Sequence, residues 1–256
     1  MVNYQTEPII KEEYADLLAR IDKQRLPQHI AVILDGNGRW AARHDLPRTA
    51  GHKAGVEAVR RLAEICRELG VPCLTVYAFS TENWKRSREE VGFLMELFVE
   101  KLYGEMSTMQ ANGIRYGFIG NREGLPDKVR RTLERAMADT AGNTDMVLNL
   151  AVNYGGRDEI VRAARALVRE GLTADAITEQ TFSDRLDTAG LPELDLLIRP
   201  SGELRLSNFL LWQAAYCEFV FMDKLWPDFG KRDLLEAVIE YQSRSRRFGG
   251  RPDDKK

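Results

Sequence analysis

The chain has 256 residues, enough to bury a sizeable core within one α/β domain. Its 37 Lys and Arg residues nearly balance 39 Asp and Glu residues, so the formal net charge of -2 gives no reason to expect nucleic acid or an anionic membrane as the main partner. Three cysteines and three histidines without metal-ligand spacing argue against a zinc site or a disulfide framework. We find no signal-peptide pattern and no apolar run of ~18 residues, and therefore expect a cytoplasmic protein without a transmembrane segment.

Apolar residues at helical spacing predict a helix over residues 9–25, which Pro27 ends. Residues 30–34 are then apolar at every position rather than alternating. This pattern favours a strand that is covered on both faces, as in a parallel sheet. The C-terminal end of such a strand is where open α/β sheets bind their ligands.

The strand stops at Asp35 and continues into Gly36-Asn-Gly-Arg-Trp40, where we expect a helix to start. Glycines leave amide N–H groups uncovered, and a phosphate placed there would meet those donors and the positive end of the following helix. Asp35 has the chemistry to hold a divalent cation that bridges to the same phosphate. We interpret the stretch as a diphosphate-plus-metal site.

Two other interpretations of this loop remain open. Asp, Asn and Gly are the usual turn residues, so the stretch also fits a plain strand-to-helix turn. The spacing Gly36-x-Gly38-x-x-Ala41 also fits the loose dinucleotide fingerprint. That fingerprint requires an acid at the end of a second strand about 20 residues later, whereas Glu57, which has the spacing, falls in a helical pattern.

The remaining pattern alternates between helices and strands. Residues 53–69 predict a helix, residues 74–79 a strand, and this βαβ unit is expected to close right-handed. Further strands are predicted at 114–119, 146–152 and 194–198, and a helix at 157–169. We expect one α/β domain with a mainly parallel central sheet flanked by helices, bounded as an N-terminal helical segment (1–28), the α/β domain itself (29–248) and a mobile tail (249–256).

A further predicted helix, residues 90–106, is apolar around much more than the ~100° stripe of a surface helix. It fits either a core helix packed on two sides or a helix with one face lining an elongated apolar cavity.

Polar and cationic residues recur just after predicted strands, at 35–39, 80–86, 153–157 and 199–207. In a parallel sheet these loops share one rim. Arg199 and Arg205 with Ser207 make a candidate anion site, because guanidinium groups match phosphate oxygens in pairs. Arg39 and Arg48, with His52, make another. The residues thus indicate two phosphorylated substrates, at least one with an apolar tail.

Long motifs in fixed order carry a resemblance over residues 29–250: Asp35-Gly-Asn-Gly-Arg-Trp-Ala, Arg48 followed by Gly51-His-Lys-Ala-Gly, Tyr77-Ala-Phe-Ser-Thr-Glu-Asn-Trp, Asn153-Tyr-Gly-Gly-Arg, Arg199-x-Ser-Gly-Glu-x-Arg-x-Ser-Asn, Trp226-Pro-Asp-Phe and Arg246-Arg-Phe-Gly-Gly. Together they resemble the cis-prenyltransferases, in particular the bacterial undecaprenyl diphosphate synthases. The resemblance implies condensation of isopentenyl diphosphate onto an allylic diphosphate, normally farnesyl diphosphate. It also implies a long-chain Z-polyprenyl diphosphate as product, the lipid carrier precursor for cell-wall synthesis.

The resemblance also implies roles for single residues. It assigns catalysis to Asp35, Asn83 and Ser80, magnesium binding to Asp35 and Glu218, and substrate binding to Gly36, Asn37, Gly38, Arg39, Trp40, Arg48, His52, Trp84, Arg86, Arg199, Arg205, Ser207 and Arg247. Leu204 occupies a position where some relatives have a histidine near the metal, so water or substrate oxygens would complete the magnesium shell. The group that takes the proton stays open, because Asn83 is a poor base and Asp35 is occupied by metal.

The resemblance further implies an apolar tunnel between the sheet and the helices at 53–69 and 90–106. Ala78 is small where a bulky residue would block that tunnel, which favours products of about ten or eleven isoprene units, and Val56 and Met146 are expected near its lining and floor. Residues 209–222 are a candidate homodimer face or core. The product would pass to the membrane at its inner face. A non-catalytic partner of the same fold and a nicotinamide-dependent oxidoreductase are the competing functions.

Overall fold

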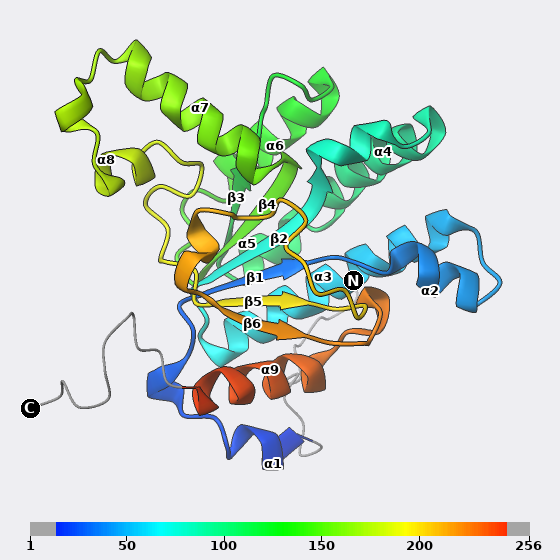
Figure 1. Ribbon diagram of the computed structural model, residues 1–256. Helices are drawn as coiled ribbons and strands as arrows, with labels where there is room; N and C mark the ends of the chain where they lie inside the picture. Colours follow the sequence, from blue (N-terminus) through cyan, green and yellow to red (C-terminus); the bar gives the residue numbers. More distant parts are fainter. Residues whose placement is uncertain (1–13, 245–256) are drawn as a thin grey trace, which may run out of the picture.

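Six parallel strands form the centre of the molecule. The computed structural model describes residues 14–244. Within them one sheet has the strand order β3-β4-β2-β1-β5-β6, and every neighbouring pair is parallel. Figure 1 shows helices on the flanks of this sheet, which confirms the expected single-domain α/β fold. The strands are β1 (His29–Ile33), β2 (Cys73–Ser80), β3 (Ile114–Ile119), β4 (Met146–Tyr154), β5 (Leu196–Arg199) and β6 (Glu218–Phe221).

The helices follow the predicted order with several shifted boundaries. They are α1 (Ala15–Leu18), α2 (Asn37–Arg43), α3 (Arg48–Leu69), α4 (Arg88–Gly104), α5 (Met106–Ala111), α6 (Asp127–Asp139), α7 (Gly156–Arg169), α8 (Glu179–Ser183) and α9 (Lys231–Ser243). The start of α2 at Asn37 corrects the expected start at Trp40, and β6, α6 and α9 have no counterpart among the predicted elements.

The prediction of one helix over residues 9–25 is wrong for the part that the structure describes. α1 ends at Leu18, and a separate 3-10 turn covers Lys23–Arg25. The Asp22 carboxylate accepts a hydrogen bond from the Gln24 amide at 2.9 Å and so caps that turn instead of continuing a helix. Residues 1–13 lie outside the described part of the chain.

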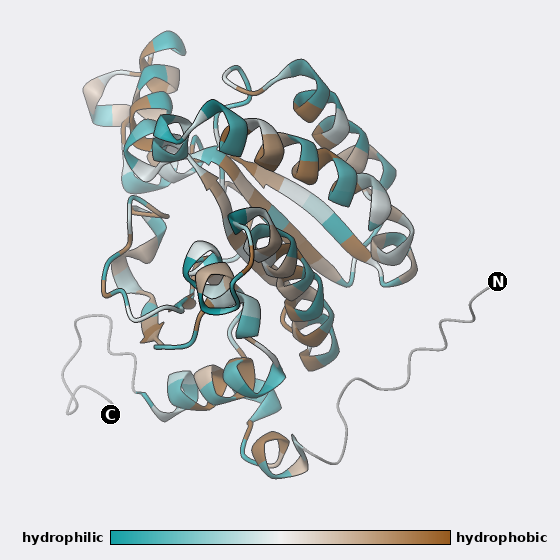
Figure 2. Cartoon of the chain, turned by 90° about the vertical axis from the view of Figure 1, so that its right-hand side faces the viewer, coloured by the Kyte–Doolittle hydropathy of each residue, from teal (hydrophilic) through white to brown (hydrophobic). Residues whose placement is uncertain are grey.

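Both faces of the sheet are buried. Ile30 and Val32 pack into a core with α3 to α6 and α9, whereas Ala31 and Ile33 pack against the segment around Phe209 on the other face. The continuous apolar run at residues 30–34 therefore reflects burial on both faces. Figure 2 shows mostly hydrophobic strands between helices whose outer sides are hydrophilic.

The carboxyl ends of β1, β5 and β6 point toward α2, which lies just beyond their arrowheads in Figure 1. The parallel arrangement brings the loops after β1, β2 and β5 to this rim. In the part of the chain that the structure describes, no helix combines the length and the apolar character needed to cross a membrane.

Candidate active site

Asp35, two residues past the end of β1, is bound by two arginines. Its Oδ2 accepts a hydrogen bond from Arg199 Nη2 at 2.9 Å, and its Oδ1 accepts one from Arg39 Nη2 at 3.4 Å. Burial alone would raise the pKa of Asp35, but the hydrogen bond from Arg199 and the charges of Arg199 and Arg39 outweigh it and hold the pKa below its ordinary value. Asp35 is therefore an ionised carboxylate at neutral pH.

The turn after Asp35 requires glycine. Gly36 has a φ of 101°, a left-handed conformation, and a Cβ there would lie 2.9 Å from Leu225 Cδ2. This turn starts α2 at Asn37 and places residues 35–39 on the wall of a large cavity. The glycines thus let the chain turn tightly past Leu225 and place the backbone of residues 36–38 on the cavity wall.

The N-terminus of α3 holds a second group of cations around one acid. Glu90 Oε1 lies 3.1 Å from Arg48 Nε, 2.9 Å from Arg86 Nη1 and 3.3 Å from His52 Nε2. Burial lowers the pKa of His52 further than the hydrogen bond with Glu90 raises it, so His52 is neutral at pH 7. Glu90 was not among the sequence-predicted site residues; its position four residues after Arg86 on the way into a helix is the signal that could have found it.

The loop after β5 supplies a third set of contacts. Arg199 Nη1 donates to Ser207 Oγ at 2.9 Å and also to the Arg205 carbonyl. Arg205 itself is 60% exposed and pairs with Glu203. Ser207 has a φ of 49°, so the loop is in an uncommon left-handed conformation where it meets Arg199. This arrangement leaves a buried guanidinium, that of Arg199, beside an exposed one, that of Arg205.

Ser80 and Asn83 cap each other in the 3-10 turn that follows β2 (Thr81–Lys85). The Ser80 amide donates to Asn83 Oδ1 at 3.0 Å, and the Ser80 side chain accepts from the Asn83 amide. Trp84 Nε1 donates to Asn153 Oδ1 at 2.7 Å, which fixes this turn to the end of β4. The side-chain oxygen Oδ1 of Asn83 thus already accepts a hydrogen bond, and the side-chain nitrogen Nδ2 is the group that can donate to a ligand.

One cavity of about 1050 Å³ joins these groups. Its apolar walls come from α3, from the α4 residues Leu94 and Phe98, and from β2 and β4. This resolves the alternative for the predicted helix at 90–106: one face of α4 lines a cavity. Ala78 and Val56 line it as expected, but Met146 is fully buried, and Leu148 lines the cavity in its place.

The cavity brings together most of the residues named from the sequence. Those on its wall are Asp35, Gly36, Asn37, Gly38, Arg39, Arg48, His52, Ser80, Asn83, Arg86, Arg199, Arg205 and Ser207. Trp40 and Trp84 do not line it; Trp40 Nε1 donates to Asp228 Oδ1 at 2.6 Å instead. Arg247 and the rest of the predicted motif from Arg246 lie outside the described residues.

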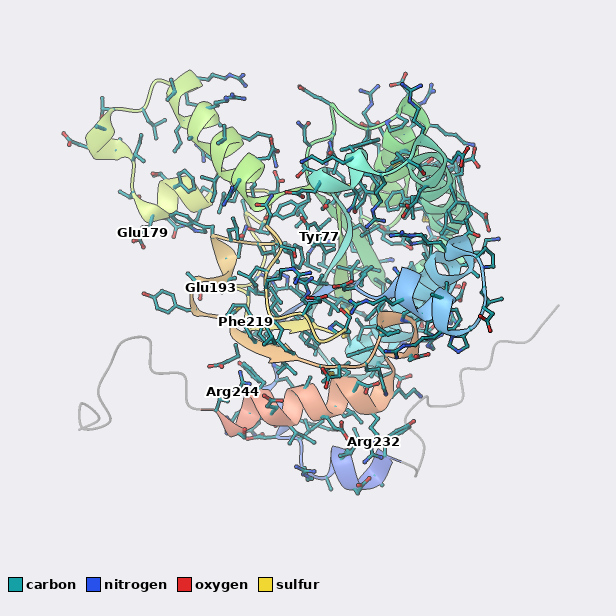
Figure 3. The ribbon with its side chains drawn as sticks, turned by 45° about the vertical axis from the view of Figure 1, so that its right-hand side comes forward. Tyr77, Glu179, Glu193, Phe219, Arg232 and Arg244 are labelled. Atoms are coloured by element: carbon teal, nitrogen blue, oxygen red, sulfur yellow. The ribbon has the colours of Figure 1, made fainter. Side chains whose placement is uncertain are left out.

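Within one chain, Glu218 does not join Asp35. Glu218 begins β6 and is level with Leu196 and Ile30. It therefore lies about 16 Å along the strand direction from Asp35, at the amino-terminal end of the strands. Its Oε2 is bound by Arg244 Nη1 at 2.9 Å. Figure 3 shows Arg244, at the end of α9, on the same side of the molecule as Phe219, whose carbonyl it also contacts at 2.8 Å.

The donor set at the mouth fits magnesium shared with a diphosphate. Among the described residues, no group of three or more His, Cys, Asp or Glu side chains is arranged to hold a metal alone. Asp35 is ionised, partly exposed and on the cavity wall. Magnesium is commonly held by one or two carboxylates, with water and phosphate oxygens completing its shell. Leu204 is 77% exposed and offers no ligand.

Two other expectations can be compared with the structure. Glu57, the acid that the dinucleotide fingerprint would need, lies on α3 and binds Lys101, and β2 ends at Ser80 without an acid. The nicotinamide interpretation therefore lacks its ribose-binding residue. In residues 209–222, Phe209 and Leu210 are fully buried core, whereas Tyr216 is 69% exposed.

Comparison with known proteins gives concordant results. Residues 33–249 match the prenyltransferase family model described as undecaprenyl diphosphate synthase. An isoprenyl transferase of Heliobacterium mobile is 55% identical over 238 residues, 91% of this chain and 92% of that protein. An isoprenyl transferase of Bacillus subtilis (strain 168) is 50% identical over 254 residues, 97% of this chain and 96% of that protein.

Two solved structures share the fold. Lavandulyl diphosphate synthase from Lavandula x intermedia, in complex with dimethylallyl diphosphate, superposes with a TM-score of 0.84 at 40% identity, over 88% of this chain and 98% of that one. A probable undecaprenyl diphosphate synthase from Campylobacter jejuni gives a TM-score of 0.73 at 35% identity, over 87% of this chain and 98% of that one.

Proposed function

The chain belongs to the undecaprenyl diphosphate synthase family of cis-prenyltransferases, and we propose that it adds isopentenyl diphosphate units in cis configuration to farnesyl diphosphate until a polyprenyl diphosphate of about ten or eleven units is made. The observation that carries the proposal is the position of the cavity: its mouth is surrounded by cationic groups, and its interior is apolar. A prenyl diphosphate has two matching parts, an anionic diphosphate that suits the mouth and a long hydrocarbon tail that suits the interior.

The cationic groups fall on two sides of the mouth, which suits two diphosphates. Arg48, with the backbone of residues 36–39, is placed to bind the allylic diphosphate, whose tail would enter between α3 and α4. Arg199, Arg205 and Ser207 are placed to bind isopentenyl diphosphate. Guanidinium groups suit this task because they match phosphate oxygens in pairs.

The reaction breaks one bond and forms one. The allylic C–O bond breaks, the diphosphate leaves, the double bond of isopentenyl diphosphate forms the new C–C bond, and a proton is lost from the added unit. Arg39 and Arg48 stabilise charge on the leaving diphosphate. Magnesium bound at Asp35 would supply further charge neutralisation there. Asn83 Nδ2, presented by the turn after β2, would orient isopentenyl diphosphate.

The apolar wall explains how one site serves repeated additions. Each buried CH₂ contributes about 0.8 kcal/mol, so each added isoprene unit strengthens binding of the tail and product release becomes slow. The product is a lipid, and we propose that the enzyme works in the cytoplasm, as a homodimer, and hands its product to the membrane as precursor of the cell-wall lipid carrier.

Incubation with farnesyl diphosphate, labelled isopentenyl diphosphate and Mg²⁺ tests the proposal. We expect label in the butanol phase, and mass spectrometry should find long polyprenyl diphosphates. No extractable label at any magnesium concentration would contradict the proposal and would favour a non-catalytic partner of this fold.

A further inference from the structure

The cavity runs along α3 and α4, away from the mouth. On α3 its lining residues extend from Arg48 to Arg60, and on α4 from Leu94 to Leu102, with Glu105 just past the end of α4. Glu90, at the start of α4, contacts Arg48 at the start of α3, so both helices begin at the mouth. At 1.5 Å per residue, Arg60 lies about 18 Å from Arg48 along α3. Arg60 and Glu105 therefore line the deep end.

The lining becomes partly charged at that depth. Val56, Val59 and Phe98 form an apolar wall, and Arg60, Lys101 and Glu105 follow them on the side of α3 and α4. The buried side chains of Leu102, Met109 and Tyr116, in contrast, keep the rest of the deep end apolar. The side chains of Arg60 and Lys101 are 36% and 27% exposed. A side chain that lines the cavity and is also exposed to solvent lies where the cavity approaches the protein surface. The deep end thus reaches the surface between α3 and α4.

One ion pair crosses the gap between the helices at this point, and two more within α3 continue from it. Lys101 Nζ on α4 lies 2.6 Å from Glu57 Oε1 on α3. Glu57 Oε2 lies 3.4 Å from Arg60 Nε, and Arg60 Nη1 lies 2.7 Å from Glu64 Oε1. We call Glu57, Arg60, Lys101 and Glu105 the α3–α4 seam. Two helices packed permanently around a hydrocarbon tunnel would be expected to seal the gap between them with apolar side chains, as Leu102, Met109 and Tyr116 seal the other sides of this end.

We propose that the α3–α4 seam is a second opening of the tunnel, closed by the Glu57–Lys101 ion pair, through which the far end of the growing chain leaves the protein. The proposal rests on the proposed function. A partly exposed ion pair contributes little to stability, whereas every added isoprene unit pushes more hydrocarbon toward the seam. Opening of this pair therefore costs up to about 1 kcal/mol, which shifts the share of longer products without fixing their length, and Glu57 and Lys101 help to determine product length in this way.

The variant Lys101→Met removes the cation but keeps an unbranched apolar stem. We expect the share of products longer than the main wild-type product to rise about fivefold, the factor that corresponds to about 1 kcal/mol, the upper range for an exposed pair. Mass spectrometry should compare the variants at equal consumption of isopentenyl diphosphate. The matched control is Arg232→Met, which breaks the Arg232–Glu236 pair on α9, at the bottom of Figure 3, and should leave the length distribution unchanged.

Charge reversal separates the ion pair from a general packing effect. Lys101→Glu places an acid opposite Glu57 and should lengthen the products, and the double variant Glu57→Lys with Lys101→Glu should restore the wild-type distribution. An unchanged or shortened distribution in Lys101→Met, or failure of the double variant to restore wild-type lengths, would overturn the proposal. If the wild-type chain makes no polyprenyl diphosphate at all, the proposed function itself fails, which is a different result.

Discussion

Asp35 Oδ2 accepts a hydrogen bond from Arg199 Nη2 at 2.9 Å across 164 positions of the chain. The Arg199 side chain is only 4% exposed, so its charge depends on Asp35 and Ser207 for compensation. The pair joins the end of β1 to the end of β5, and it lies where the two diphosphates are proposed to meet. Asp35 therefore has two tasks, as counter-ion of Arg199 and as the candidate magnesium ligand.

The variant Asp35→Asn tests whether both tasks depend on the negative charge of the side chain and not on its size. The amide keeps the size of the side chain but removes the negative charge, so we expect the condensation rate to fall at least about 100-fold. We expect the free energy of unfolding to fall by about 1–3 kcal/mol, because Arg199 loses its counter-charge. Label incorporation and urea denaturation measure the two effects.

The control for this variant is Asp139→Asn, which removes an exposed carboxylate 3.3 Å from Arg135. It should be nearly neutral in both assays. Near-normal turnover of Asp35→Asn would mean that the metal binds elsewhere.

Ala78→Leu should shorten the product. Ala78 lines the cavity on β2, and the added methyl groups would occupy space that the growing chain needs. Mass spectrometry should show fewer isoprene units per product, while label is still incorporated. Ala164→Leu, at an exposed position on α7, should leave product length unchanged. Equal lengths for Ala78→Leu and wild type would mean that the chain does not pass this residue.

The sheet could be predicted largely from the sequence because its strands are buried on both faces. The run at residues 30–34 has no polar interruption of the kind that makes a boundary ambiguous, and the strand at 114–119 is interrupted only by the exposed Arg115. β6 was missed because it has only four residues, one of which is buried. Tyr154, expected in a loop, continues β4 because its ring is fully buried against Phe209.

The site could be predicted where one motif contains both the turn and the chemistry, as in residues 35–39. What the sequence could not provide was pairing between distant segments. Glu90 binds Arg48 and His52 from another helix, and the i,i+4 spacing of Arg86 and Glu90, which marks Glu90 itself, does not indicate these two partners. Glu218 was assigned by resemblance alone. The register of β6 places it at the amino-terminal end of the strands, whereas Asp35 follows the carboxyl end of β1.

Gly55→Ala should disrupt the mouth of the cavity. A Cβ at Gly55 would overlap Asn37 Oδ1, so the Asn37 side chain at the start of α2 would have to move. We expect a loss of about 1–3 kcal/mol in unfolding free energy, together with lower activity. Gly92→Ala is the matched control: nothing lies within 4 Å of the added Cβ on α4, and alanine should stabilise that helix by up to about 1 kcal/mol. Equal behaviour of the two variants would contradict the close packing of α2 on α3.

His29 should make the protein less stable in mild acid. Burial lowers the pKa of His29 to about 4, although hydrogen bonding to the Pro192 carbonyl opposes the shift. The unfolded chain has a His pKa of about 6.5, so the unfolded state binds the proton first as the pH falls from about 6.5 toward 4. The stabilisation is thus complete above about pH 6.5 and is lost below it, by about 2 kcal/mol between pH 7 and pH 5.

Urea denaturation at several pH values measures this loss. His29→Gln removes the titrating group, so its unfolding free energy should fall less over the same pH range. Parallel curves for the variant and the wild type would contradict the assignment to His29.

A crystal structure with Mg²⁺ and a thiodiphosphate analogue of farnesyl diphosphate tests the central claim most directly. We predict a metal on Asp35, the diphosphate against Arg48 and residues 36–39, and the hydrocarbon tail between α3 and α4 beside Val56 and Phe98. A tail outside this cavity, or a diphosphate bound away from Asp35, would contradict the account.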